Sequence, residues 1–283
     1  MSSKHLLSSL LSHIELNDYI AFDLETTGLH PQKDFVTEIG ACRFIDGEIQ
    51  DQYTTLINPG IPVPKNIVEI TGITDDMLED APSIEESLPE LIKFLGNSPL
   101  VGHNIDFDYE FINKSCVEND ISFPDLAMYD TLSLARTFIY FHNSFSLTSL
   151  CDYYNISIQQ AHRAGEDALA TGILFKHLIQ EAVSRPLALI QLMDSIFKNS
   201  GKIYNCKLFG NILKTAVRKN SVDGLMDSTS DYTSPKNIFG SGSIAKENQL
   251  PKSPDEWFLN DGLIQTNWTG YESRLSQLEF IKD

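Results

Sequence analysis

The sequence is poor in the features of disulfide-stabilised, zinc-binding and membrane-spanning proteins. Its 283 residues include only four cysteines, and no two of them have the Cys-x-x-Cys spacing of a zinc or redox site. No apolar run approaches the roughly 20 residues that a membrane-spanning helix needs. We therefore expect a cytoplasmic protein without a disulfide framework, a structural zinc site or a membrane span.

Basic side chains are scarce in the first part of the chain. Residues 1–180 hold 9 Lys and Arg against 27 Asp and Glu, whereas residues 181–283 hold 12 of each, so the first part carries the whole net charge of −18. Phosphate affinity normally comes from Lys and Arg, so this part alone would bind nucleic acid weakly. The change in composition near residue 180 predicts a domain boundary.

Apolar periodicity and turn residues predict an α/β fold. The first three strands form an antiparallel meander, in which Asp46-Gly47 is a hairpin signal. Later helices alternate with short buried strands, so we expect a mixed sheet of meander plus parallel strands with flanking helices. The expected strands are 18–25, 35–49, 51–59, 98–104 and the start of 128–138; the expected helices are 82–96 with Gly96 as its stop, 106–120, the end of 128–138, 146–156 and 163–183.

Five regions follow from these patterns. We expect an N-terminal helix rather than a signal peptide at 1–15, the α/β domain at 16–182, a basic helical extension at 183–221, a linker or disordered segment at 222–256, and a tail at 257–283. The run from Lys198 to Lys219 has six basic residues and no acid. A solvated helix face is favoured for this run over a surface that guides a nucleic-acid strand.

Two carboxylates end the first strand. Asp23 and Glu25 lie two residues apart, so their side chains point to the same face. Close carboxylates repel each other unless they are protonated, paired with a cation or bound to a metal. No Lys or Arg lies in the surrounding FDLETTG, and hard oxygen ligands select Mg²⁺ or Mn²⁺. The alternative is a solvated strand end that happens to carry two acids.

Two further patches place acids at helix starts. In VGHNIDFDYEF, a strand ends at His103 and a helix opens with Asp106 and Asp108. In AHRAGEDALAT, His162 precedes a helix and Asp167 follows five positions later. Each acid could simply complement a helix dipole, and the histidine could be an ordinary surface-loop residue.

Together and in this order, the three patches resemble the DnaQ-like 3′→5′ exonucleases of the DEDDh type, which have four acids, one histidine and an RNase H-like fold. The matching motifs are FDLETTG, GHNIDFD and HRAGED, and the resemblance covers about residues 16–180. The family includes the proofreading epsilon subunit of bacterial DNA polymerase III, to which the chain is similar. Residues 181–283 resemble no family that we can name.

The resemblance implies a role for each matching residue. It makes His162 the general base and predicts two divalent cations, Mg²⁺ or Mn²⁺. Asp106 does not match and is placed on the exposed helix start, while Asn104 and Asp130 are assigned structural roles. The implied metal-binding and catalytic carboxylates are Asp23, Glu25, Asp108 and Asp167.

The resemblance also implies a loop that holds the terminal nucleotide. Leu29 of that loop could wedge against a base, or it could equally be a core leucine. The implied substrate-binding residues are Thr26, Thr27, Gly28, Leu29, Thr71 and Gly72.

The leading interpretation is a metal-dependent exonuclease that releases nucleoside 5′-monophosphates from single-stranded DNA 3′ ends, in replication proofreading or repair. An RNA or oligoribonucleotide exonuclease and a catalytically idle adaptor are the alternatives. Because the first part is acidic, a polymerase or another replication or repair protein could present the DNA end, bound through the C-terminal extension. Trp257, Phe258 and Trp268 are aromatic anchors there.

Overall fold

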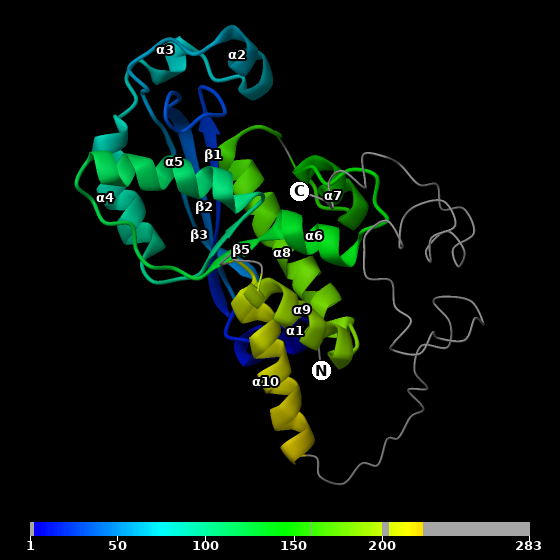
Figure 1. Cartoon of the computed structure of the whole chain (residues 1–283). Helices are drawn as coiled ribbons and strands as arrows, with labels where there is room; N and C mark the ends of the chain where they lie inside the picture. The colour runs from blue at the N-terminus through cyan, green and yellow to red at the C-terminus, as the bar shows by residue number, and fades with distance from the viewer. Residues whose placement is uncertain (1–2, 159, 200–203, 223–283) are drawn as a thin grey trace, which may run out of the picture. The chain divides into compact units, whose positions relative to one another are not determined.

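One mixed sheet organises the chain. The computed structural model describes residues 3–158, 160–199 and 204–222 (Figure 1). Within them, five strands form a sheet of order β3-β2-β1-β4-β5. The strands are β1 (Asp18–Thr26), β2 (Val36–Ile45), β3 (Glu48–Leu56), β4 (Leu100–Gly102) and β5 (Met128–Asp130). The first three pair antiparallel, and β4 and β5 continue the sheet in parallel with β1, which confirms the predicted meander plus parallel strands.

Helices fill the connections between these strands. The described helices are α1 (Ser3–His13), α2 (Lys65–Thr71), α3 (Asp75–Leu78), α4 (Ile84–Leu95), α5 (Ile105–Glu118), α6 (Thr131–Phe138), α7 (Leu147–Tyr154), α8 (Ala164–Ser184), α9 (Leu187–Asn199) and α10 (Cys206–Val222). The short helices α2 and α3 were not predicted, because their few residues offer no sustained apolar period. Among the described residues, no helix is long and apolar enough to cross a membrane.

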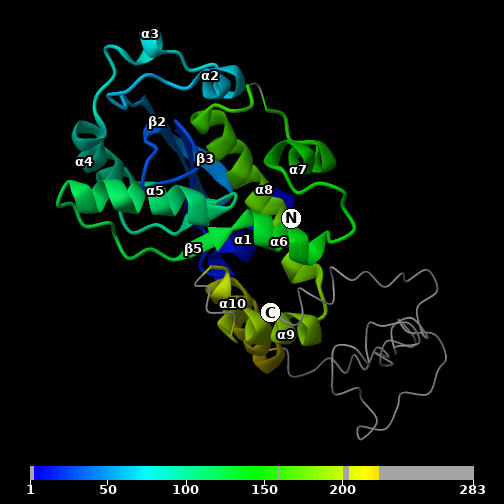
Figure 2. The ribbon, with the colours of Figure 1, turned by 45° about the horizontal axis from the view of Figure 1, so that its top comes forward.

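The sheet separates two hydrophobic cores. Figure 2 shows α4 and α5 on one side of the sheet and α8 on the other. Tyr19 and Ala21 of β1 belong to the core beneath α8, whereas Ile20 and Phe22 belong to the core beneath α4 and α5. This alternation follows from the two-residue period of a strand. It has a direct consequence for the site, because Asp23 continues the series that faces α8.

Local turn chemistry agrees with the predicted element ends. Asp46 and Gly47 both have positive φ, 53° and 78°, as the tight turn between β2 and β3 requires. Ser83 and Glu86 form a capping box at the start of α4, and Gly96 ends that helix with a φ of 55°. These turns depend on adjacent residues only, which is why sequence patterns predict them.

Helix α10, which belongs to the described part of the basic run, does not flank the end of β1 that carries the acids. The Asn205 side chain donates to the Asp130 carbonyl beside β5, and from there α10 runs to α1, where Asn211 donates to the carbonyl of Ile14 (Figure 1). Lys198 is paired with Asp194 on its own helix. The predicted domain limits stay predictions, and the predicted linker from residue 223 on and the tail lie outside the described residues.

Candidate active site

Strand β1 delivers the first two carboxylates. Asp23 and Glu25 stand on its α8-facing side, and both are half-buried. The regular ladder to β2 pairs Glu25 with Glu38 and is interrupted by a bulge directly after Glu25. The two acids therefore lie at the C-terminal end of a central strand, where open α/β sheets place their ligands.

The turn between β4 and α5 delivers Asp108. Asn104 adopts a left-handed conformation, φ 68°, without a capping hydrogen bond from its side chain, so its contribution to the turn comes from the backbone. Asp130 accepts the N–H of Asn104 at 2.7 Å and the N–H of Ser133 at 2.9 Å, which agrees with the structural role expected of it. Asp108 is buried one turn into α5 and accepts the N–H of Leu24 on β1 at 3.0 Å.

The neighbouring Asp106 differs from expectation in one respect. It is partly buried, whereas an exposed position at the helix start was predicted. Asp106 precedes Asp108 by two positions, and successive helical residues are rotated by about 100°. Its side chain therefore points in a different direction from that of Asp108. Asp108 is thus the acid of this helix that contacts β1.

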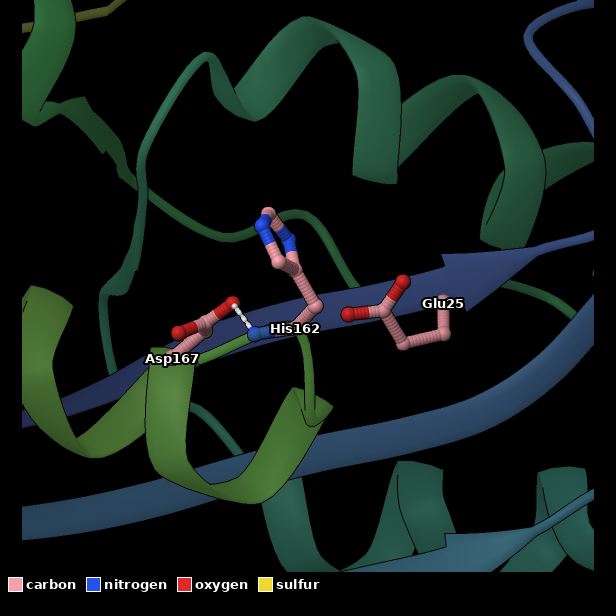
Figure 3. A group of neighbouring side chains, drawn as sticks. All are labelled: Glu25, His162 and Asp167. Atoms are coloured by element: carbon pink, nitrogen blue, oxygen red, sulfur yellow. Dashed lines mark hydrogen bonds between the residues drawn. The ribbon is translucent and has the colours of Figure 1, made fainter. Parts of the chain in front are cut away.

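The start of α8 delivers the remaining pair. Ligand atoms of Glu25, His162 and Asp167 all lie within 4.8 Å of one another. Figure 3 shows the His162 imidazole between the two carboxylates. His162 is exposed, with a φ of 63°, and its N–H donates to Asp167 at 3.1 Å. The side chain thus reaches the acids from the solvent side, while its backbone is held by one of them.

Electrostatics connect Asp23 and Asp108 to this group. Removal from water, followed by the charges of Asp108 and Asp167, raises the pKa of Asp23 well above its ordinary value. Burial also raises the pKa of Asp108, against the opposing hydrogen bond from Leu24. Since such effects act only between near neighbours, four carboxylates from three distant segments share one site.

The pKa values of the other two acids are raised as well. Burial and the charges of Asp167 and Glu38 raise the pKa of Glu25 to about 7, although Arg163 lowers it. Burial raises the pKa of Asp167, while the hydrogen bond from His162 lowers it. The site therefore holds more negative charge than its protein neighbours compensate.

This donor set fits divalent cations. Carboxylate oxygens are hard ligands of the kind that Mg²⁺ and Mn²⁺ take, and a bound cation would offset the repulsion that raises these pKa values. The four acids could hold such ions, with His162 at the exposed rim. Without a cation, the clustered carboxylates stabilise each other's protonated forms.

A buried ion pair positions the start of α8. Arg163 donates to Glu38 through Nε at 3.0 Å and Nη2 at 2.6 Å, and Glu38 also accepts the N–H of Ala164 at 3.0 Å. Glu38 is only 1% exposed and lies opposite Glu25 in the sheet. Sequence analysis missed this pair, although a glutamate within the apolar strand VTEIGACRF was a signal for it.

The predicted nucleotide loop is tightly folded. The Thr26 hydroxyl donates to the Gly28 carbonyl at 2.6 Å, and the Thr27 hydroxyl accepts the N–H of Phe35 at 3.0 Å. Leu29 projects from this loop and is 75% exposed, so the core-leucine alternative is wrong. The threonines shape the backbone, and Leu29 is the side chain that the loop presents to solvent.

Thr71 and Gly72 occupy a second turn. The Thr71 hydroxyl donates to the Ile67 carbonyl at 3.0 Å and accepts the N–H of Ile73 at 3.1 Å, while Gly72 ends α2 with a φ of 70°. These contacts build the turn after α2. Contact of either residue with a nucleotide stays a prediction.

Similar stretches occur in curated bacterial sequences named DNA polymerase III PolC-type. DNA polymerase III PolC-type from Clostridium perfringens is 32% identical over 243 residues, 84% of this chain and 16% of that protein. The Thermotoga petrophila protein of the same name is 37% identical over 204 residues, 70% of this chain and 15% of its own length. The chain thus corresponds to a small part of these relatives.

Solved structures and a family model agree with this similarity. E. coli exonuclease I in complex with a dT13 oligonucleotide matches 64% of this chain and 43% of its own, with a TM-score of 0.54 and 20% identity. The nuclease domain of 3′hExo, a DEDDh family member bound to rAMP, matches 58% and 92%, with a TM-score of 0.51 and 18% identity. Both show the shared fold. The family model described as "Exonuclease" matches residues 20–175. The chain belongs to this family, the DnaQ-like DEDDh 3′–5′ exonucleases, which are hydrolases that use divalent metals.

Proposed function

We propose that this chain removes nucleotides from single-stranded DNA 3′ ends and releases nucleoside 5′-monophosphates. One observation carries the proposal: buried and half-buried acids from β1, α5 and α8 share a site with an exposed histidine. A terminal phosphodiester needs a nucleophile on one side and charge compensation on its oxygens. The site offers a proton acceptor and cation ligands for these two tasks.

The proposed metal ligands are the four acids. When bound, two divalent cations, Mg²⁺ or Mn²⁺, supply positive charge for the phosphate oxygens and activate water. The buried Asp108 stays in place through its hydrogen bond to Leu24. The full set of proposed ligands is Asp23, Glu25, Asp108 and Asp167.

His162 is the proposed general base. It is exposed, so its imidazole can exchange protons with solvent, and imidazole is the side chain that most often accepts a proton in general-base catalysis. The hydrogen bond from its N–H to Asp167 positions the residue at the rim of the acid cluster. His162 thus takes the proton from the attacking water, and solvent removes it afterwards.

Leu29 is the proposed contact for the terminal base. The tight loop around Thr26 and Thr27 holds its backbone, and 75% exposure leaves the side chain free to touch a base. Apolar contact with a base face is independent of base identity. Such a contact suits an enzyme that shortens ends of any sequence.

A role in proofreading or repair, in the cytoplasm, is the proposed biological setting. It is supported by the similarity to part of DNA polymerase III PolC-type proteins. The net charge of −18 disfavours unaided DNA binding, so the proposed partner is a polymerase or another replication protein that binds the C-terminal extension.

The test is digestion of matched, end-labelled DNA and RNA 3′ overhangs by the full chain in Mg²⁺. We expect nucleoside 5′-monophosphates from DNA, abolished by a chelator and by Asp23→Ala. Asp106→Asn is the matched control, because this neighbouring acid is outside the proposed ligand set, and it should retain activity within about threefold. Faster release from RNA would identify the chain as an RNA exonuclease. No release from either substrate would favour a catalytically idle adaptor.

A further inference from the structure

Three large aromatic side chains are exposed next to one another between α6 and α8. Tyr140, Phe141 and Tyr153 are 78%, 62% and 42% exposed. Burial of a large apolar side chain is worth roughly 1.5–3 kcal/mol, so leaving three adjacent rings in water is costly. A contiguous exposed apolar patch of this kind marks a binding surface.

The exposed rings belong to a continuous series, which we call the aromatic row. Successive ring centroids along Phe145, His142, Tyr153, Phe141 and Tyr140 are 6.3, 5.1, 6.5 and 5.6 Å apart. Phe145 and His142 are half-buried, and exposure increases to Tyr140 at the far end. The row therefore extends from the body of the fold into solvent.

The inner end of the row is fixed to the motif that carries Asp108. Nε2 of His103 donates to the Phe145 carbonyl at 2.9 Å, and Nδ1 of His103 lies 2.9 Å from the Thr131 hydroxyl. His103 immediately follows β4 and precedes the turn into α5. Figure 1 shows α7, which contributes Tyr153, beside α8. The row thus starts at the C-terminal ends of the parallel strands, where the acid cluster also lies.

Charge and spacing favour one kind of occupant. Residues 137–151, which hold every ring of the row except Tyr153, contain no acid, and exposed Asp152 beside Tyr153 is the one acid between residues 137 and 165, in a chain whose net charge is −18. This surface therefore repels a phosphate backbone less than its surroundings do. The centroid spacings of 5.1–6.5 Å exceed the roughly 3.4 Å rise of stacked bases. Rings this far apart suit bases that are already separated, as in an extended single strand, and not a duplex.

We propose that the aromatic row is a base-stacking platform for the single strand that leads into the active site. Tyr140, Phe141 and Tyr153 stack on bases that lie on the 5′ side of the 3′-terminal nucleotide. Stacking on aromatic faces is independent of sequence and does not need the cations that this domain lacks. The platform rests on the proposed exonuclease function, and it explains how an acidic domain can hold its substrate.

The test compares a long and a short substrate with the full chain in Mg²⁺. A combined Tyr140→Ser, Phe141→Ser and Tyr153→Ser variant should raise KM for a dT12 oligonucleotide at least tenfold, because each lost stack weakens binding. Its KM for dT3, which offers only two bases beyond the terminal nucleotide, should rise much less than its KM for dT12. Leu192→Ser with Ile196→Ser is the matched control, because these α9 side chains are 54% and 50% exposed and lie outside the row.

Two further measurements separate the platform from folding and from the proposed activity. Tyr140→Ser alone removes the most exposed ring, so it cannot unfold the core, and it should still raise KM for dT12. Fluorescence anisotropy of labelled dT12 in a chelator measures strand binding whether or not the chain hydrolyses DNA. If the wild type binds dT12 through the rings but cleaves nothing, the activity fails and the platform stands. An unchanged KM and unchanged anisotropy would overturn the platform and leave a protein as the partner of the rings.

Discussion

At the residue scale, the site combines buried acids with an exposed base. Asp108 is buried and Asp23, Glu25 and Asp167 are half-buried, so removal from water, followed by the charges of neighbouring acids, raises their pKa values. His162 lies at the rim, where it can exchange protons with water. Acids placed this way favour cation binding, and a base placed at the rim can release its proton to solvent after each reaction.

Replacement of His162 tests that division of tasks. With saturating Mg²⁺, His162→Ala should lower kcat on the order of 100-fold or more at about pH 8, because general-base catalysis contributes that much. The melting temperature should not change, since the side chain is exposed. His30→Ala, at another exposed histidine, is the control for kcat. Activity within about twofold of wild type would remove His162 as the base.

The Glu38–Arg163 ion pair should stabilise the folded chain, because it fixes the start of α8 to β2. Arg163→Gln would leave Glu38, 1% exposed, without its guanidinium partner, and breaking a buried pair this way costs about 3–5 kcal/mol. Lys198→Gln, which breaks the exposed pair with Asp194, should cost under about 1 kcal/mol. Urea unfolding of both variants measures the difference, and equal losses would contradict the positioning role of the buried pair.

At the element scale, the site depends on how closely the start of α8 approaches β2. Gly40 of β2 lies under Ala164, and a Cβ on Gly40 would clash with the carbonyl group of Ala164. Gly165 faces β3 in the same way, with Thr54 at 2.8 Å from its added Cβ. Small residues on both elements therefore let the helix that carries Asp167 rest directly on the sheet.

Gly40→Ala should disturb both stability and activity. The added methyl group must push α8 away from the sheet, which costs on the order of 1–3 kcal/mol and displaces His162 and Asp167. We expect a lower urea midpoint and at least a tenfold loss of kcat, since misplacement by about 1 Å can cost 100-fold. Gly60→Ala has open space but a φ of 71°, so it should lose about 1–2 kcal/mol from the left-handed backbone alone and keep a normal kcat. Normal kcat in Gly40→Ala would show that α8 need not approach so closely.

At the scale of the whole molecule, the acid cluster makes the metal-free protein sensitive to pH. The folded-state pKa of each site acid lies above its ordinary value, and that of Glu25 is about 7. Between the ordinary value of 4.5 and about 7, the folded chain therefore holds more protons than the unfolded chain. The free energy of unfolding must fall as pH rises through this window.

We expect the melting temperature in a chelator to fall between about pH 4.5 and pH 7. After solvent screening, Glu25 alone should account for a loss of about 2 kcal/mol in the free energy of unfolding. The glutamine in Glu25→Gln cannot ionise, so the melting temperature of this variant should fall less over the same pH range. The difference between the two curves separates the contribution of Glu25 from that of other titrating groups. Mg²⁺ should restore stability at about pH 8 and do less at about pH 5, where Glu25 is protonated. Parallel curves for wild type and Glu25→Gln would contradict the raised pKa.

Local patterns in the sequence determined much of the fold and named the central residues of the site. The two-residue strand period predicted that Asp23 and Glu25 share a face, and the turn at Asp46-Gly47 and the stop at Gly96 were predicted from neighbouring residues alone. These features depend on contacts within a few positions of the chain, so a short stretch contains all the information they need.

Only the tertiary structure decided which distant side chains meet. Arg163 contacts Glu38 across 125 positions, Leu29 proved exposed, and the rings of Tyr153 and Phe141 come together from α7 and the preceding loop. Such contacts depend on how whole elements pack, and packing is set by the summed fit of many side chains rather than by a local pattern. The sequence therefore named the acids, and the packing of α8 on the sheet brought His162 and Asp167 to Glu25.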